Sequence, residues 1–149
     1  MFKDTYEDEI SSAFGFAKKA REATGAVFPV LLIETPAADL TIPIVGGLKD
    51  RYSVLDIAAK ALKDKFPLAI MSLSETEAEV DKSITLPKDF ISAGAVLLTV
   101  IGALGVKGFV MPFTTRKQGV VYGEVVSKDM IVDPQLVNIL LPVLKTASC

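Results

Sequence analysis

Histidine and tryptophan are both absent from this chain of 149 residues, and its one cysteine is the last residue, Cys149. Without an imidazole, histidine-based catalytic triads and dyads and all histidine metal sites are excluded. A single cysteine allows neither an internal disulfide nor a thiolate metal cluster, which indicates a reducing compartment such as the cytosol. The sequence therefore leans away from an enzyme and predicts no cofactor.

A strong charge of either sign is also missing. The 16 basic and 18 acidic residues give a net charge of −2, which offers no general field for attracting nucleic acid. The N-terminus is acidic where a signal peptide would be basic. The uncharged stretch from Ile91 to Val106 would span about 24 Å as a helix, too short for a bilayer core of about 30 Å. We therefore expect a cytoplasmic protein with no nucleic-acid partner and no membrane span.

What the chain does have is apolar surface to bury. Half of its residues are hydrophobic and 23% are charged, which excludes intrinsic disorder. The length is that of one ordinary domain, and we see no internal repeat, linker or break in composition. The sequence predicts a single domain over residues 1–149.

Three segments carry helical patterns. From Asp4 to about Thr24, apolar residues recur at four-residue spacing and Gly25 follows as a stop. A second helix capped by Ser53 is predicted to bury one stripe and to end at Pro67, and its stripe is Leu55, Ala59, Leu62 and Phe66. Asp133 before Pro134 is a strong start for a third helix, which Pro142 is expected to kink or end.

Between the helices lie runs that are typical of strands. Residues 27–33 and 40–45 predict a hairpin, with the second strand at a sheet edge or a bulge because Pro43 cannot donate a ladder hydrogen bond. Residues 68–73, 93–101, 109–113 and 120–126 predict further strands, the last two as a hairpin. The order α-β-β-α-β-β-β-β-α predicts one layered α+β domain, with about three helices on a mainly antiparallel sheet of about five strands. In element order it resembles small layered folds such as the roadblock and profilin-like group, although no motif of those families is present.

Three carboxylates, Glu75, Glu77 and Glu79, alternate along the chain. If the preceding strand continues through them, they share one face and are able to bind Mg²⁺ or Ca²⁺ or to raise one another's pKa. The other interpretation is a solvated edge that prevents edge-to-edge pairing of sheets. This second interpretation is the one we favour, because neither EF-hand spacing nor a glycine-fixed loop accompanies the carboxylates.

Arg116 and Lys117 lie at the expected tip of the last hairpin. The Arg116 guanidinium is suited to bidentate hydrogen bonds with a carboxylate or phosphate. Exposed basic turns are common, however, and two positive charges do not make a nucleic-acid patch. We favour a solvated turn.

The C-terminal helix is apolar nearly all round, which indicates burial on more than one side. A subunit interface is one place for it, and the core of the monomer is the other. The leading hypothesis is a non-enzymatic cytosolic protein that forms homo-oligomers or docks to a protein partner, with interface candidates Leu136, Ile139, Leu140 and Val143. The alternative is a domain that binds a small molecule or divalent cation, and is possibly catalytic, through Glu75, Glu77, Glu79 and Arg116.

Overall fold

The computed structural model describes residues 6–44, 51–77, 85–86 and 88–147. These residues form three α-helices, a short 3₁₀ helix and seven strands. In chain order they are α1 Glu7–Thr24, β1 Val30–Glu34, β2 Asp39–Pro43, α2 Arg51–Leu62, β3 Ala69–Glu77, β4 Phe90–Gly102, β5 Gly105–Arg116, β6 Gly119–Tyr122, β7 Val126–Ser127, the 3₁₀ helix η1 Asp129–Ile131 and α3 Pro134–Ala147. The predicted α+β class and element order are confirmed.

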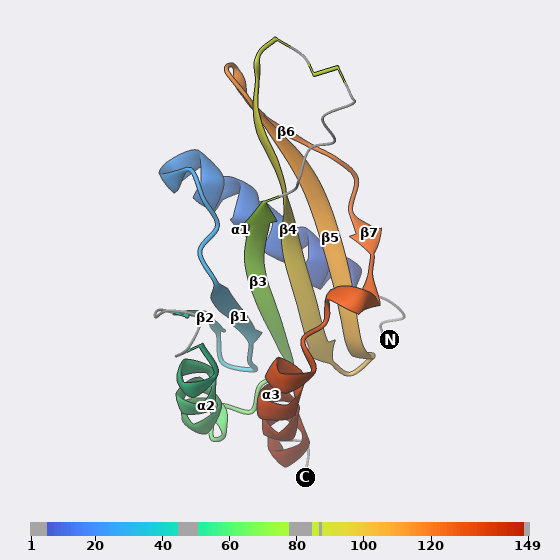
Figure 1. The fold of residues 1–149 in the computed structure, drawn as a ribbon. Coiled ribbons are helices and arrows are strands. Elements are labelled where there is room, and N and C mark those ends of the chain that lie inside the picture. The colour runs from blue at the N-terminus through green and yellow to red at the C-terminus, as the bar shows by residue number, and fades with distance from the viewer. Residues whose placement is uncertain (1–5, 45–50, 78–84, 87, 148–149) are drawn as a thin grey trace.

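The strands form one antiparallel sheet in the order β2-β1-β3-β4-β5-β6, with β7 also paired to β5 (Figure 1). The sheet has seven strands where the sequence predicted about five. Strand β2, which ends at Pro43, is an edge strand, as its proline predicted. Strands β4 and β5 are long because a tight turn joins them, and Gly105 takes a φ of +91° there.

Helix α1 covers one face of the sheet, behind β3, β4 and β5 in Figure 1. The predicted stripe is confirmed: Tyr6, Phe14 and Ala17 are buried and Ile10 is half-buried against them. The helix ends at Gly25, which has a φ of +81° and donates its N–H to the Arg21 carbonyl. With the inward residues of β1, β3, β4 and β5, this helix forms the first core.

Helices α2 and α3 cover the other face, but only at one end of the sheet (Figure 1). The second core joins them to Leu31, Ile33, Ile70 and Ile101 of the strands. A hydrogen bond of 2.7 Å from the Tyr52 hydroxyl to Asp133 Oδ2 ties α2 to the start of α3. Beyond these two helices, η1 packs at Gly108 of β5, where an added Cβ would meet Ile131 at 2.8 Å, and neither α2 nor α3 covers the rest of this sheet face.

Two sequence predictions about α2 need correction. Ser53 does not cap the helix, because α2 already includes Arg51 and Tyr52 before it. Phe66 is not part of the α2 stripe: the helix ends at Leu62, and Phe66 has a φ of +54° and a side chain that is 58% exposed. The helix therefore ends before Pro67, and the chain turns between Leu62 and Phe66. In α3, Pro142 was expected to kink or end the helix; it does not end it, because α3 continues through Pro142 to Ala147.

The stretch from Ile91 to Val106 forms most of β4, a turn and the start of β5. Within the residues that the structure describes, no helix has the length and apolar character needed to cross a membrane. The expectation of a strand and a turn in this stretch is confirmed.

Candidate functional site

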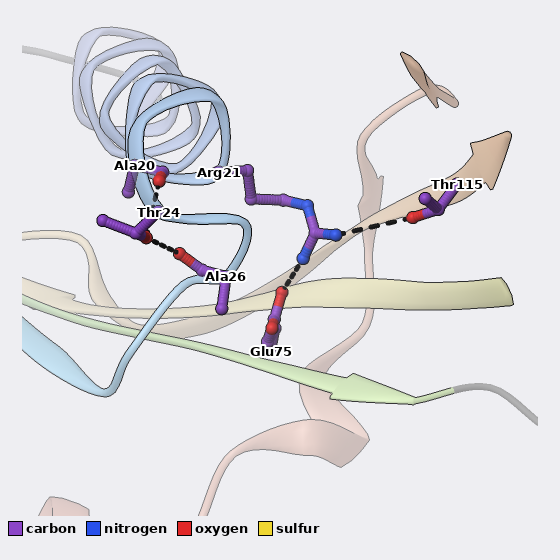
Figure 2. Close-up of polar contacts among 6 residues, drawn as sticks. All are labelled: Ala20, Arg21, Thr24, Ala26, Glu75 and Thr115. Atoms are coloured by element: carbon purple, nitrogen blue, oxygen red, sulfur yellow. Dashed lines mark hydrogen bonds and ion pairs between the residues drawn. The ribbon is translucent and has the colours of Figure 1, made fainter. Parts of the chain in front are cut away.

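Arg21, in the last turn of α1, is the most buried charged side chain at the far end of the first core. The helix end is fixed by Thr24, whose hydroxyl lies 2.8 Å from the Ala20 carbonyl and 3.0 Å from the Ala26 carbonyl (Figure 2). From this position the Arg21 side chain, 9% exposed, reaches down to the sheet and forms an ion pair with Glu75 of β3. Its other terminal nitrogen lies 3.5 Å from the Thr115 hydroxyl of β5. Arg21 therefore joins α1 to two strands.

Beneath the guanidinium lies an aromatic platform. The Arg21 Cζ is 4.0 Å from the centre of the Phe113 ring, a cation–π distance. The Phe113 ring in turn rests on Gly94 of β4, where an added Cβ would meet the ring at 2.7 Å. Arginine, phenylalanine and glycine are thus stacked on three different elements.

A pocket of about 310 Å³ opens beside this stack. It is lined by Arg21, Gly25, Glu75, Thr76, Glu77, Ser92, Ala93 and Phe113. Near it, burial raises the pKa of Tyr122 above its ordinary value, although the positive charge of Arg21 acts in the opposite direction. The Arg21 guanidinium is already neutralised by Glu75, so the pocket offers an anion no free positive charge from this residue.

The structure tests part of the predicted carboxylate group. Strand β3 does continue through Glu75 and Glu77, which share one face, while Glu79 lies outside the described residues. Strand β1 pairs with β3 only as far as Leu73, so one edge of β3 is without a strand partner among the described residues from Ser74 onward. Glu75 is committed to Arg21 and Glu77 is exposed at this edge. Among the described residues, no group of three or more acidic or cysteine side chains is placed to hold a metal ion.

Arg116 and Lys117 are not brought to these carboxylates. Glu75 shares the first-core face with Phe113, and the alternation of β5 turns Arg116 to the opposite face. Lys117 lies in the short turn between β5 and β6, where its backbone N–H donates to the Asp89 carbonyl at 2.9 Å. The structure therefore does not assemble the set of residues that a cation or anion site at Glu75, Glu77 and Arg116 requires.

The predicted interface residues on α3 lie largely in the protein's own interior. Leu136, Leu140 and Val143 are buried in the second core of the single chain, and Ile139 is half-buried beside them. The apolar character of α3 is explained by this packing against α2 and the sheet. An interface between copies needs a different surface.

Such a surface exists on the uncovered part of the second sheet face, which we name the open face. The register of the paired strands β3 to β7 places the residues of the open face beside one another. They are Ser74, Thr76, Ala93, Ala95, Leu97, Val110, Pro112, Thr114, Val121 and Val126. None of these ten residues is charged, but Arg116, two residues beyond Thr114 on β5, lies on the same sheet face. Helices α2 and α3 lie at the other end of the sheet (Figure 1). Antiparallel sheets that face water normally alternate apolar and polar residues, so this composition is unusual for a solvated face.

Sequence reasoning missed both Arg21 and the open face. Arg21 and Glu75 are 54 positions apart, and only the packing of α1 on β3 brings them together. The open face did leave a signal, because residues 93–101 are apolar at odd and even positions alike, a pattern typical of a strand covered on both sides.

Comparisons of the chain with protein-family models, with curated proteins and with solved structures find no match.

Proposed function

We propose that this chain is a non-enzymatic protein that forms a homodimer by packing the open faces of two copies against each other. The observation that supports this most is the open face itself, whose ten named residues carry no charge and which α2 and α3 do not cover; Arg116 lies at its end. Val121 and Val126, at its β6 and β7 side, are 52% and 49% exposed. A second sheet would remove this apolar area from water.

The shape of the open face suits a second copy. Two antiparallel sheets pack face to face about 10 Å apart with their strands rotated by about 30°. In a twofold dimer each patch meets itself, so a charged residue near the axis would face its own copy. The ten named residues carry no charge, and a twofold axis among them avoids that repulsion, with Arg116 at the edge of the patch.

The size of the patch sets the expected strength. Across the sheet the patch is four strands wide, at about 4.8 Å per strand. Along the strands it covers three steps between same-face residues, at about 7 Å per step, so its area is about 400 Å² per copy. A dimer would then bury about 800 Å², which is below the standard interface size of about 1,600 Å² and typical of weak or transient contacts. We expect a reversible dimer with a Kd of about 10 to 100 µM.

Other features are consistent with a binding protein in the cytosol. Histidine is absent, so the commonest general acid and base at neutral pH is missing. The ion pair of Arg21, whose side chain is 9% exposed, with Glu75 joins structural elements. The single cysteine permits no internal disulfide, as is usual for proteins of a reducing compartment.

Sedimentation velocity from about 5 to 500 µM tests the proposal. The parent should shift from monomer to dimer over this range. Val121→Lys, in the open face, should remain monomeric, because a cation at the interface would be buried without a partner. Ile57→Lys is the matched control: it changes an apolar side chain that is 68% exposed on α2, outside the open face, and should dimerise like the parent.

Two results would contradict the proposal. One is a parent chain that stays monomeric up to about 500 µM, which would leave docking to a different protein as the use of the open face. The other is equal loss of dimer in Val121→Lys and Ile57→Lys, which would place the interface elsewhere.

A further inference from the structure

A groove lies on the other side of the sheet, between α1 and β5. Its volume is about 690 Å³, within the range of about 300 to 1,000 Å³ that is common for small-molecule sites. The floor and walls are apolar: Phe14 and Met111 are buried, and Ile10 and Val125 line the sides. The groove therefore offers a hydrocarbon chain apolar contacts along one side.

Gly15 lines this groove from the middle of α1. Glycine destabilises a helix interior by about 1 kcal/mol relative to alanine. At Gly15 neither backbone nor packing requires it: its φ is not positive, and an added Cβ would have nothing within 4 Å. By contrast, Gly123 on the opposite wall is needed, because a Cβ there would meet Pro112 at 2.8 Å. Because Gly15 has no side chain, this part of the groove is open space.

The charges at the two ends of the groove differ. Glu7 and Lys18 both line it, and 11 helical positions between them correspond to about 16 Å along α1. The Lys18 ammonium lies 5.2 Å from the centre of the Tyr122 ring, and no carboxylate among the described residues pairs with it. It is thus a cation at the end of an apolar groove, held by an aromatic ring rather than by an opposite charge.

We propose that this groove binds a medium-chain fatty acid anion, with the hydrocarbon chain over Phe14 and Met111 and the carboxylate at Lys18. The proposal is independent of self-association, because the groove and the open face lie on opposite faces of the sheet. A single amphipathic molecule fits both features at once: the apolar lining takes the chain and the ammonium takes the head group.

Calorimetric titration with octanoate, decanoate and dodecanoate, each below its micelle concentration, is the first measurement. Each added methylene that enters the groove should lower the Kd about fourfold. Dodecyltrimethylammonium, with the same chain and a cationic head, should bind at least tenfold more weakly than dodecanoate. Affinity that does not depend on chain length, or equal affinity for both heads, would overturn the proposal.

Variants at Gly15 separate binding from folding. Gly15→Leu places a side chain in the groove and removes a helix-destabilising glycine, so its Tm should rise by about 3 °C while dodecanoate affinity falls at least tenfold. Ser12→Leu is the control, because Ser12 lies on the same helix but lines a different pocket; its affinity should equal the parent's. Unchanged dodecanoate affinity in Gly15→Leu would contradict the site.

The lysine is tested in the same way. Lys18→Gln should lose the preference for dodecanoate over the cationic detergent, whereas Lys19→Gln, an exposed neighbour outside the groove, should keep it. A control titration with neutral phosphatidylcholine vesicles should give no binding. Binding to vesicles together with no binding of monomeric dodecanoate would overturn the proposal in favour of a lipid surface.

Discussion

The second face of the sheet has two halves that lie on the same strands but differ in composition. In the covered half, beneath α2 and α3, large side chains such as Ile70 and Ile101 are fully buried. A few residues further along β3 and β4, in the open face, the residues that point to this same side of the sheet are Ser74, Ala95 and Leu97. The side chains become smaller, yet charged residues do not replace them.

The absence of charge in the open half is informative. Where a sheet face meets only water, charged side chains cost little and protect against association. The acidic residues at this end of the sheet lie instead on the opposite face, where Glu75 pairs with Arg21 and Glu77 is exposed. Uncharged side chains on a sheet face are what a second sheet can pack against, and this contrast is the basis of the proposed dimer.

The largest effect is expected in the covered half. Leu62→Ala removes a side chain that is 1% exposed in the second core, and should lower the free energy of unfolding by about 2 to 5 kcal/mol. Ile57→Ala, on the outer side of the same helix, should change it by less than about 0.5 kcal/mol. Urea titrations measure both values, and similar losses would show that α2 is packed with a different face inward.

Loss of the Arg21 partner should have the next largest effect. Glu75→Gln leaves a guanidinium that is mostly buried without its opposite charge, and should lower the free energy of unfolding by about 2 to 3 kcal/mol. Glu77→Gln, two residues along the same face, should change it by less than about 0.5 kcal/mol, because Glu77 is exposed.

The two glutamine variants also distinguish the interpretations of the acidic segment. Thermal ramps with and without Mg²⁺ or Ca²⁺ should show no cation-dependent rise in Tm for the parent or either variant, because Glu75 is occupied by Arg21. A rise in the parent that Glu75→Gln abolishes would restore the divalent-cation hypothesis.

A smaller loss of folding stability is expected at alkaline pH. It should affect the covered half, where Tyr52 lies, and leave dimerisation through the open face unchanged. The pKa of Tyr52 is raised, chiefly by its hydrogen bond to Asp133, and burial raises the pKa values of Tyr6 and Tyr122. A tyrosine whose folded pKa is raised contributes stability that is present below its unfolded pKa of about 10 and lost as the pH rises through the folded value. None of the ten named residues of the open face is ionisable.

Unfolding titrations between pH 8 and pH 11 measure this loss. The urea midpoint should be steady up to about pH 9 and fall above about pH 10, and Tyr52→Phe should fall less steeply than the parent. Dimerisation should stay constant from pH 6 to pH 9. A parent and a Tyr52→Phe variant with the same pH profile would show that the Asp133 hydrogen bond does not hold the phenol protonated.

Much of the fold could be predicted from the sequence because its signals are local. The α1 stripe, the stop at Gly25 and the edge position of β2 depend on residues close together in the chain. The Asp133 cap of α3 was predicted in the same way, and its Oδ1 accepts the Gln135 N–H at 3.0 Å. Phe66 was assigned wrongly because its spacing continues the α2 period, while the actual end of the helix depends on how the chain turns into β3.

The sites were harder to predict because they depend on packing between distant segments. Alternation correctly placed Glu75 and Glu77 on one face, but the Arg21 partner requires the position of α1 on the sheet. Arg116 was expected in a solvated turn at the hairpin tip, with an anion contact as the alternative. Strand β5 instead includes it, and the alternation of side chains along the strand points it away from Glu75. The interface was expected on α3, and the packing of α3 into the monomer was the alternative that periodicity alone did not separate.

Chemical cross-linking through single cysteines tests the open-face dimer most directly. In a Cys149→Ser background, Ala95→Cys, Val110→Cys and Val121→Cys place one thiol each on the open face, and Ile57→Cys places one on α2. At about 100 µM with a short bifunctional thiol reagent, at least one open-face variant should give a covalent dimer, and dilution to about 1 µM should abolish it. Cross-linking at Ile57 equal to or above that of all three open-face positions would contradict the account.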